Sequence, residues 1–242
     1  MKYLWMVFSL LVSIGHVQDA SASGETKGTT LIVLADATGS LDDVFLGQQS
    51  LRELLQGTTR DLVRATTDHR TSVDLVLIRV CGFAELVYRG SVTKRDYAQL
   101  SLVMNEGLAA CNIKADSPDA KAHQNRASGT DLSDGFRMLA SYLELYVQHE
   151  IIFVMLSDGF NQPPELAGAV DNEGAISAME AALTPSLEDV SLAVALGLHS
   201  ETYAQWDLAF SKLFAGNSRA YGLNDMQQGR KDVVDLIITL KR

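Results

Sequence analysis

Residues 31–40 read LIVLADATGS, and this stretch decides the fold. Its first five residues are all apolar, which is typical of a strand that is buried on both faces, as the strands of a parallel sheet are. The run ends at Asp36, and small polar residues follow it. The pattern therefore predicts a central parallel strand whose carboxyl end carries polar side chains.

Apolar strands and amphipathic helices alternate along the rest of the chain. The patterns predict further strands over 73–80, 84–89, 151–156, 190–198 and 218–222. They predict helices over 51–62, 97–109, 132–143, 172–183, 203–213 and 224–240, with Thr130 and Asn224 as N-caps of two of them.

Only three residues separate the expected strands over 73–80 and 84–89, too few for a crossover helix, so this pair must form an antiparallel hairpin. We therefore expect an α/β fold with a doubly wound, mostly parallel sheet, one antiparallel edge strand and helices on both faces.

The N-terminus has the pattern of a signal peptide. Lys2 precedes an apolar run over residues 3–14, and Ala20-Ser21-Ala22 fits the small-x-small cleavage rule. The apolar run is shorter than the ~20 residues that a membrane-spanning helix needs, although an uncleaved anchor is the alternative. We expect a periplasmic or secreted protein with no membrane span once mature. The expected organisation is a signal peptide over 1–22, a short polar leader over 23–28, and one domain over 29–242.

Composition narrows the class of protein. The chain has 20 Lys and Arg against 30 Asp and Glu, a net charge of −10, and 47% of its residues are hydrophobic. These values are typical of a globular protein. The chain is acidic overall and its sequence has no cluster of Lys and Arg, so a nucleic-acid partner is not expected.

The two cysteines are Cys81 and Cys111. Cysteines of an exported protein tend to pair, because the compartment is oxidising, so a disulfide is expected, with two free buried thiols as the alternative.

Polar side chains follow two of the expected strands and precede one helix. Asp36, Thr38 and Ser40 follow the first strand, Asp158 follows the strand over 151–156, and Thr130 stands before a helix. In a doubly wound sheet all of them can meet at the carboxyl edge. Two carboxylates and three hydroxyls, without His or Cys, suit Mg²⁺ or Mn²⁺ rather than zinc.

The order of these motifs resembles the von Willebrand factor type A family over residues 29–241. Asp36-Ala37-Thr38-Gly39-Ser40 is similar to the DxSxS loop of the family's metal-ion-dependent adhesion site, with Thr38 in place of the middle serine. Thr130 and Asp158 match the later threonine and aspartate of that site. The resemblance implies a binding protein without catalytic residues. In such a protein an Asp or Glu of a protein partner completes the coordination of a divalent cation.

Two other interpretations remain open. Asp36 and the residues after it also resemble the nucleophile loop of haloacid-dehalogenase-like phosphatases, although those enzymes need a second aspartate where Thr38 stands. The other alternative is a type A scaffold whose metal site is not used. A serine hydrolase is not expected, because no GxSxG motif occurs.

Overall fold

The structure is a computed structural model that describes residues 28–38, 41, 45–67, 73–108, 129–146, 148–163, 166 and 169–240. The expected signal peptide, almost all of the polar leader and Cys111 lie outside these residues, so export and the disulfide stay predictions. Cys81 is buried, and its carbonyl accepts a hydrogen bond from the Asp131 amide at 2.9 Å. No helix in the described part of the chain is long and apolar enough to span a bilayer.

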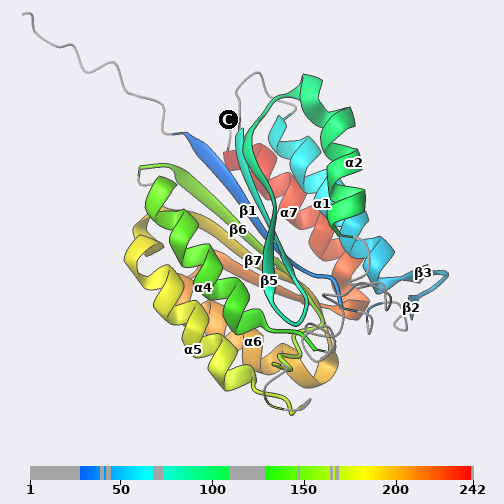
Figure 1. The fold of residues 1–242 in the computed structure, drawn as a ribbon, viewed down its shortest axis with the longest axis vertical. Coiled ribbons are helices and arrows are strands. Elements are labelled where there is room, and N and C mark those ends of the chain that lie inside the picture. The colour runs from blue at the N-terminus through cyan, green and yellow to red at the C-terminus, as the bar shows by residue number, and fades with distance from the viewer. Residues whose placement is uncertain are drawn as a thin grey trace, which may run out of the picture.

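A six-stranded sheet forms the centre of the molecule, in the order β5-β4-β1-β6-β7-β8 (Figure 1). Its strands are β1 (Thr29–Asp36), β4 (Val73–Val80), β5 (Ala84–Val92), β6 (Glu150–Leu156), β7 (Val190–Leu198) and β8 (Ser218–Gly222). All neighbouring strands are parallel except β4 and β5, which pair antiparallel at the edge. The doubly wound, mostly parallel sheet with one antiparallel edge strand is thus confirmed.

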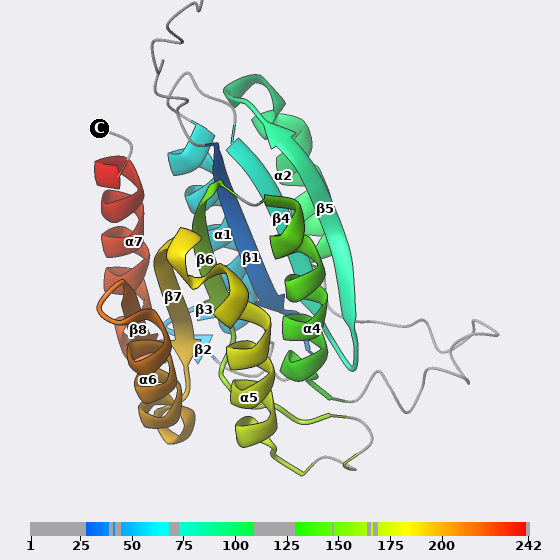
Figure 2. The same cartoon turned by 90° about the vertical axis from the view of Figure 1, so that its left-hand side faces the viewer.

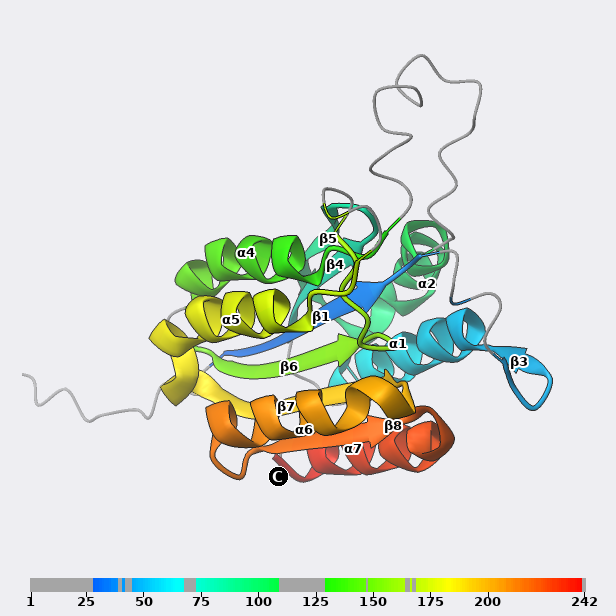
Figure 3. The same cartoon turned by 90° about the horizontal axis from the view of Figure 1, so that it is seen from below.

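Helices cover both faces of this sheet (Figure 2). One face packs against α1 (Leu51–Thr67), α2 (Tyr97–Gly107) and α7 (Met226–Leu240), and the other against α4 (Leu132–Leu143), α5 (Asn172–Leu183) and α6 (Ser200–Phe214). A small hairpin of β2 (Phe45–Leu46) and β3 (Gln49–Ser50) stands just before α1 (Figure 3).

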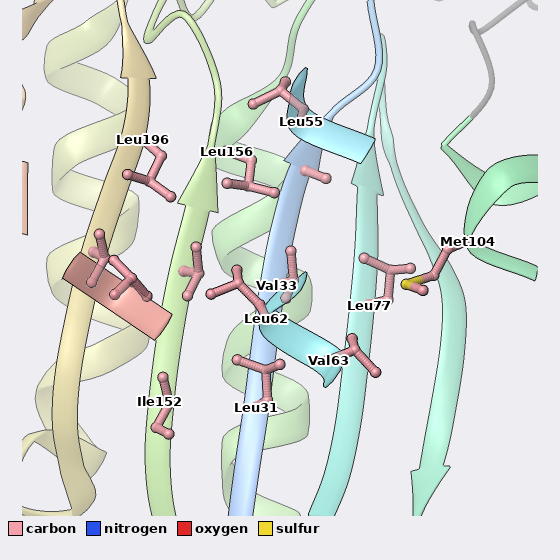
Figure 4. Packing of buried hydrophobic residues seen from close by; sticks show 14 of the residues in the cluster. Leu31, Val33, Leu55, Leu62, Val63, Leu77, Met104, Ile152, Leu156 and Leu196 are labelled. Atoms are coloured by element: carbon pink, nitrogen blue, oxygen red, sulfur yellow. The ribbon is translucent and has the colours of Figure 1, made fainter. Parts of the chain in front are cut away.

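The apolar run that opens the domain is explained by this two-sided packing. Leu31 and Val33 of β1 belong to the core under α1, α2 and α7, whereas Ile32 and Leu34 belong to the core under α4, α5 and α6. Side chains alternate along a strand, so a strand with a helical layer on each face needs apolar residues at every position. Figure 4 shows the first of these cores, with Leu62 of α1 packed among the strand side chains.

Several predicted boundaries and caps differ from the structure. The hairpin strand β5 runs to Val92, and α2 ends at Gly107. Thr130 is not the N-cap of α4: Asp131 is, and its carboxylate accepts a hydrogen bond from the Asp134 amide at 2.9 Å. Asn224 lies inside a 3₁₀ turn over Leu223–Asp225 that leads into α7.

At Gly135, α4 packs tightly against the sheet. A Cβ atom at Gly135 would lie 2.8 Å from methyl carbons of Leu34 and Val80, closer than packed carbon atoms tolerate. Gly57, a half-buried glycine of α1, is the matched control, because the nearest atom to its Cβ would be 3.8 Å away.

We predict opposite effects of alanine at these two glycines. Gly135→Ala should destabilise the protein by roughly 1–3 kcal/mol through overpacking. Gly57→Ala should stabilise it by up to about 1 kcal/mol, because alanine restricts the unfolded chain and favours the helix. Urea denaturation of both variants measures the difference, and a Gly135→Ala protein as stable as the wild type would contradict the close packing.

Candidate metal centre

The candidate site lies where the strand order reverses, at the carboxyl ends of β1 and β6. From β1 the chain proceeds to β4 on one side, and β6 pairs with β1 on the other. Ligands of doubly wound sheets bind at this place. Asp36 is the last residue of β1 and Asp158 follows β6 by two residues, and their side chains are nearly buried, with 3% and 8% of their surface exposed.

Asp36 is held by three hydrogen bonds. Its Oδ1 accepts from the Thr38 amide at 2.9 Å and from the Thr38 hydroxyl at 2.8 Å, and its Oδ2 accepts from the Ser157 hydroxyl at 3.1 Å. Thr38 and Ser157 therefore fix the carboxylate from the β1 side and the β6 side at once.

Thr130, which stands before α4, joins the group formed by Asp36 and Thr38. Its hydroxyl donates to the Thr38 hydroxyl at 3.2 Å. Its backbone pairs with Gln162, through N–H···O distances of 3.1 and 2.7 Å, so the chain before α4 is fastened to the loop after β6. This pairing occupies the backbone of Thr130 and explains why Asp131, rather than Thr130, caps α4.

Asp158 is positioned by the loop after β6 and by α6. Its Oδ1 accepts from the Phe160 amide at 3.0 Å, and its carbonyl accepts from the Thr202 hydroxyl at 2.7 Å. The Trp206 indole donates to the Gly159 carbonyl at 2.8 Å. Gly159 has a φ of +83°, and a Cβ there would lie 2.6 Å from the Thr202 hydroxyl, so this turn requires glycine.

The structure thus brings four of the five expected ligands together. Asp36, Thr38 and Thr130 form one hydrogen-bonded group, and Asp158 lies near enough for its charge to act on Asp36. Ser40 lies outside the described residues.

Burial and mutual repulsion make this pair of carboxylates hard to ionise. Burial, and then the negative charge of Asp158, raise the pKa of Asp36 to about 7, against the opposing effect of the hydrogen bonds from Thr38 and Ser157. Burial also raises the pKa of Asp158. Within the described residues no Lys, Arg or His forms an ion pair with either carboxylate.

The donor set fits a hard divalent cation. Carboxylate and hydroxyl oxygens converge at one place, and they are the ligand types that Mg²⁺ and Mn²⁺ prefer. Among the described residues no group of three or more His, Cys, Asp or Glu side chains could hold a metal ion, so a cation at this place would need hydroxyl ligands beside the two carboxylates. A bound cation would also offset the burial and the repulsion by Asp158 that raise the pKa of Asp36.

Sequence reasoning missed Arg52, a buried arginine of α1 that holds the loop after β1. Its guanidinium donates to the carbonyls of Thr38 and Ala37 at 2.6 and 3.1 Å, and to the Leu108 carbonyl beyond α2 at 3.4 Å. It therefore ties the backbone that carries Thr38 to two helices. No sequence pattern marks this role, because the acceptors are backbone carbonyls.

Asn161, which is fully buried, supports the opposite side of the site. Its side-chain oxygen accepts from the Leu132 amide at 2.8 Å, and its side-chain nitrogen donates to the Asp171 carbonyl at 2.7 Å. This amide joins the starts of α4 and α5 to the loop of Asp158. Ser157 was also missed as a partner of Asp36, although its place directly before Asp158 was a usable signal.

We compared the chain with known protein families, curated proteins and solved structures. No protein-family model and no curated protein matches the chain. Several solved structures are similar to this chain in fold. One is a von Willebrand factor type A protein from Catenulispora acidiphila, with a TM-score of 0.56 and 11% identity, matching 88% of this chain and 42% of that one. Another is BatB from Bacteroides thetaiotaomicron, with a TM-score of 0.59 and 14% identity, matching 88% of this chain and 99% of that one.

A third similar structure is proximal thread matrix protein 1 from the mussel byssus, described with a zinc-occupied MIDAS motif. Its TM-score is 0.52 and its identity 9%, over 88% of this chain and 48% of that one. The chain spans less than half the length of the Catenulispora and mussel proteins. Because the sequence identities are this low, the similarity concerns the fold alone. The fold of this chain is that of a von Willebrand factor type A domain.

Proposed function

We propose that this is an exported, non-enzymatic binding protein. It holds a divalent cation, Mg²⁺ or Mn²⁺, through Asp36, Thr38, Ser40, Thr130 and Asp158. A partner protein then supplies an Asp or Glu side chain that completes the shell of the cation. The observation that carries the proposal is the pair of nearly buried carboxylates, Asp36 and Asp158, brought together with hydroxyl donors at the switch point of the sheet.

Charge supports the role of the partner. The hydroxyls of Thr38, Ser40 and Thr130 are neutral, so the negative charge available to the ion comes from two aspartates alone. A site of this kind favours an additional oxygen anion from outside, which is how a cation can select an acidic residue of a protein. The mussel protein, which has a similar fold and is described with a zinc-occupied MIDAS motif, gives indirect support for metal binding.

The phosphatase alternative predicts different chemistry. In that mechanism Asp36 would attack a phosphoryl group, and an acid two residues later would protonate the leaving group. Thr38 occupies that position, and it donates both its amide and its hydroxyl to Asp36. The proposal therefore predicts no covalent labelling of Asp36 by acetyl phosphate in the presence of Mg²⁺, and a phosphorylated Asp36 would favour the enzyme.

We predict that Asp36→Asn abolishes binding of Mg²⁺ and Mn²⁺, because the amide keeps the shape of the side chain but loses its charge. Thr38→Ser should bind nearly as well as the wild type, because the hydroxyl is retained, whereas Thr38→Val should bind roughly 10-fold more weakly or worse. Isothermal titration calorimetry of chelator-treated protein measures these affinities.

The control for these titrations is Asp235→Asn, which removes an exposed carboxylate of α7. It should leave metal affinity unchanged. Equal affinities of the wild-type and Asp36→Asn proteins would show that the cation binds elsewhere.

Stability without metal should depend on pH through Asp36. Its pKa is about 7 in the folded protein, above the value in the unfolded chain, so between about pH 4 and 7 the unfolded chain has lost the proton that the folded protein keeps. This contribution therefore makes the folded protein less stable as pH rises through that range. Asparagine at position 36 cannot ionise, so the Asp36→Asn protein lacks the effect.

In EDTA we predict that the free energy of unfolding of Asp36→Asn, relative to that of the wild type, increases by roughly 1–3 kcal/mol between pH 5 and pH 8, since one pKa unit corresponds to about 1.4 kcal/mol. The variant should then be the more stable protein at pH 8. Excess Mg²⁺ should reverse the order at pH 8, because only the wild type binds the ion. Thermal and urea unfolding at the two pH values test this, and a difference between the proteins that does not change with pH would contradict the raised pKa.

Arg52 should matter for metal affinity beyond its effect on stability. Lysine at this position keeps the charge but cannot reach the carbonyls of Ala37, Thr38 and Leu108 together. We predict that Arg52→Lys weakens Mg²⁺ binding roughly 10-fold, as losses of supporting contacts around metal ligands do. Arg64→Lys, at an exposed position of the same helix, is the control. Wild-type affinity in a folded Arg52→Lys protein would contradict this role.

A further inference from the structure

A cavity of about 320 Å³ lies directly beside the candidate metal centre. Thr130 and Asp158 form its wall on the metal side, and Leu51, Phe160 and Leu223 contribute apolar surface. A residue whose carboxylate reached the cation would therefore have an adjoining pocket for a neighbouring apolar side chain.

A second cavity, of about 470 Å³, lies next to the first. The two cavities share His199 and Leu223 in their walls, and we call the pair the carboxyl-edge groove. His199 follows the end of β7 and Leu223 follows the end of β8. The groove thus starts at the loop after β6 and crosses the carboxyl ends of β7 and β8 towards the edge of the sheet.

The outer end of the groove is negatively charged. Asp225 lines the second cavity and is exposed. The negative charges of Asp207 and Asp225 contribute, after burial, to a raised pKa of Tyr203, which also lines this cavity, so both carboxylates act on this end. Neither of them forms an ion pair with a Lys or Arg among the residues that the structure describes.

We propose that the carboxyl-edge groove binds an extended segment of a protein partner that carries an acidic, an apolar and a basic side chain in that spatial order. The acidic side chain reaches the cation, the apolar one packs on Leu223, and the Lys or Arg lies at Asp225. This inference rests on the proposed function, because the acidic residue needs the metal.

The fold sets the spacing between the two charges of the partner. Neighbouring strands lie about 4.8 Å apart, so the ends of β6 and β8 are separated by on the order of 10 Å. An extended chain advances about 3.3 Å per residue, so this separation corresponds to roughly three residues. The basic residue of the partner should therefore stand two to four residues from the acidic one.

Selection from a random peptide library tests the proposal, with the full mature chain immobilised in Mg²⁺ and, in parallel, in EDTA. The proposal predicts enrichment of Asp or Glu only in Mg²⁺, accompanied by Lys or Arg two to four residues away and an apolar residue between them. Enrichment of Asp or Glu in Mg²⁺ without a basic neighbour would overturn the groove but leave the proposed function standing. No magnesium-dependent enrichment of acidic residues would overturn both.

Charge reversal at the outer end sharpens this test. For a selected peptide, Asp225→Lys should weaken binding about 2- to 5-fold, the size expected for one exposed ion pair, and changing the basic residue of the peptide to Glu should restore it. Asp235→Lys makes the same change of charge on α7 and is the matched control, since it lies outside the groove. Equal loss of affinity in both variants would mean that net charge, not the groove, selects the peptide.

Discussion

Two carboxylates, Asp36 and Asp158, are nearly buried at the ends of neighbouring parallel strands, and the surrounding structure is arranged around this constraint. The register of β1 and β6 brings the two loops to the same edge, so the like charges are held near each other. Hydroxyl and amide donors lower the cost of the charge but do not remove it, because the pKa of Asp36 stays near 7. The divalent cation that we propose would offset this cost.

Much of the supporting structure keeps these groups in place rather than contributing ligands. Arg52 fixes the backbone under Thr38, Gly159 permits the turn after Asp158, and Asn161 joins that turn to α4 and α5. All three act through the backbone or through helix starts. This arrangement allows the loops to keep a binding geometry while the carboxylates repel each other, which is the expected design of a prearranged ion site.

The fold could be predicted from the sequence because its inner strands are buried on both faces. Continuous apolar runs marked β1, β6 and β7, and the short gap after Val80 required the antiparallel edge. The convergence of Asp36 and Asp158 also followed from the topology, since the carboxyl ends of the parallel strands β1 and β6 meet at one edge. Local signals were enough because β1, β6 and β7 each need both faces apolar.

The parts that could not be predicted depend on contacts between distant segments. Thr130 has the residue type of an N-cap, but pairing with Gln162 uses its backbone, so Asp131 caps the helix instead. Arg52 looks like an ordinary helix residue, and its buried role requires carbonyls of Ala37 and Leu108 that only the tertiary structure supplies. The groove likewise exists only because the loops after three strands lie side by side.

The most direct test of the central claim, that Asp36 and Asp158 frame a cation site, is a crystal structure of the protein grown with Mn²⁺ and measured for anomalous scattering. The account predicts one strong anomalous peak at the carboxyl ends of β1 and β6, within bonding distance of oxygens from the Asp36 loop and Thr130. A fully ordered site without a peak, or a peak bound elsewhere on the molecule, would contradict it.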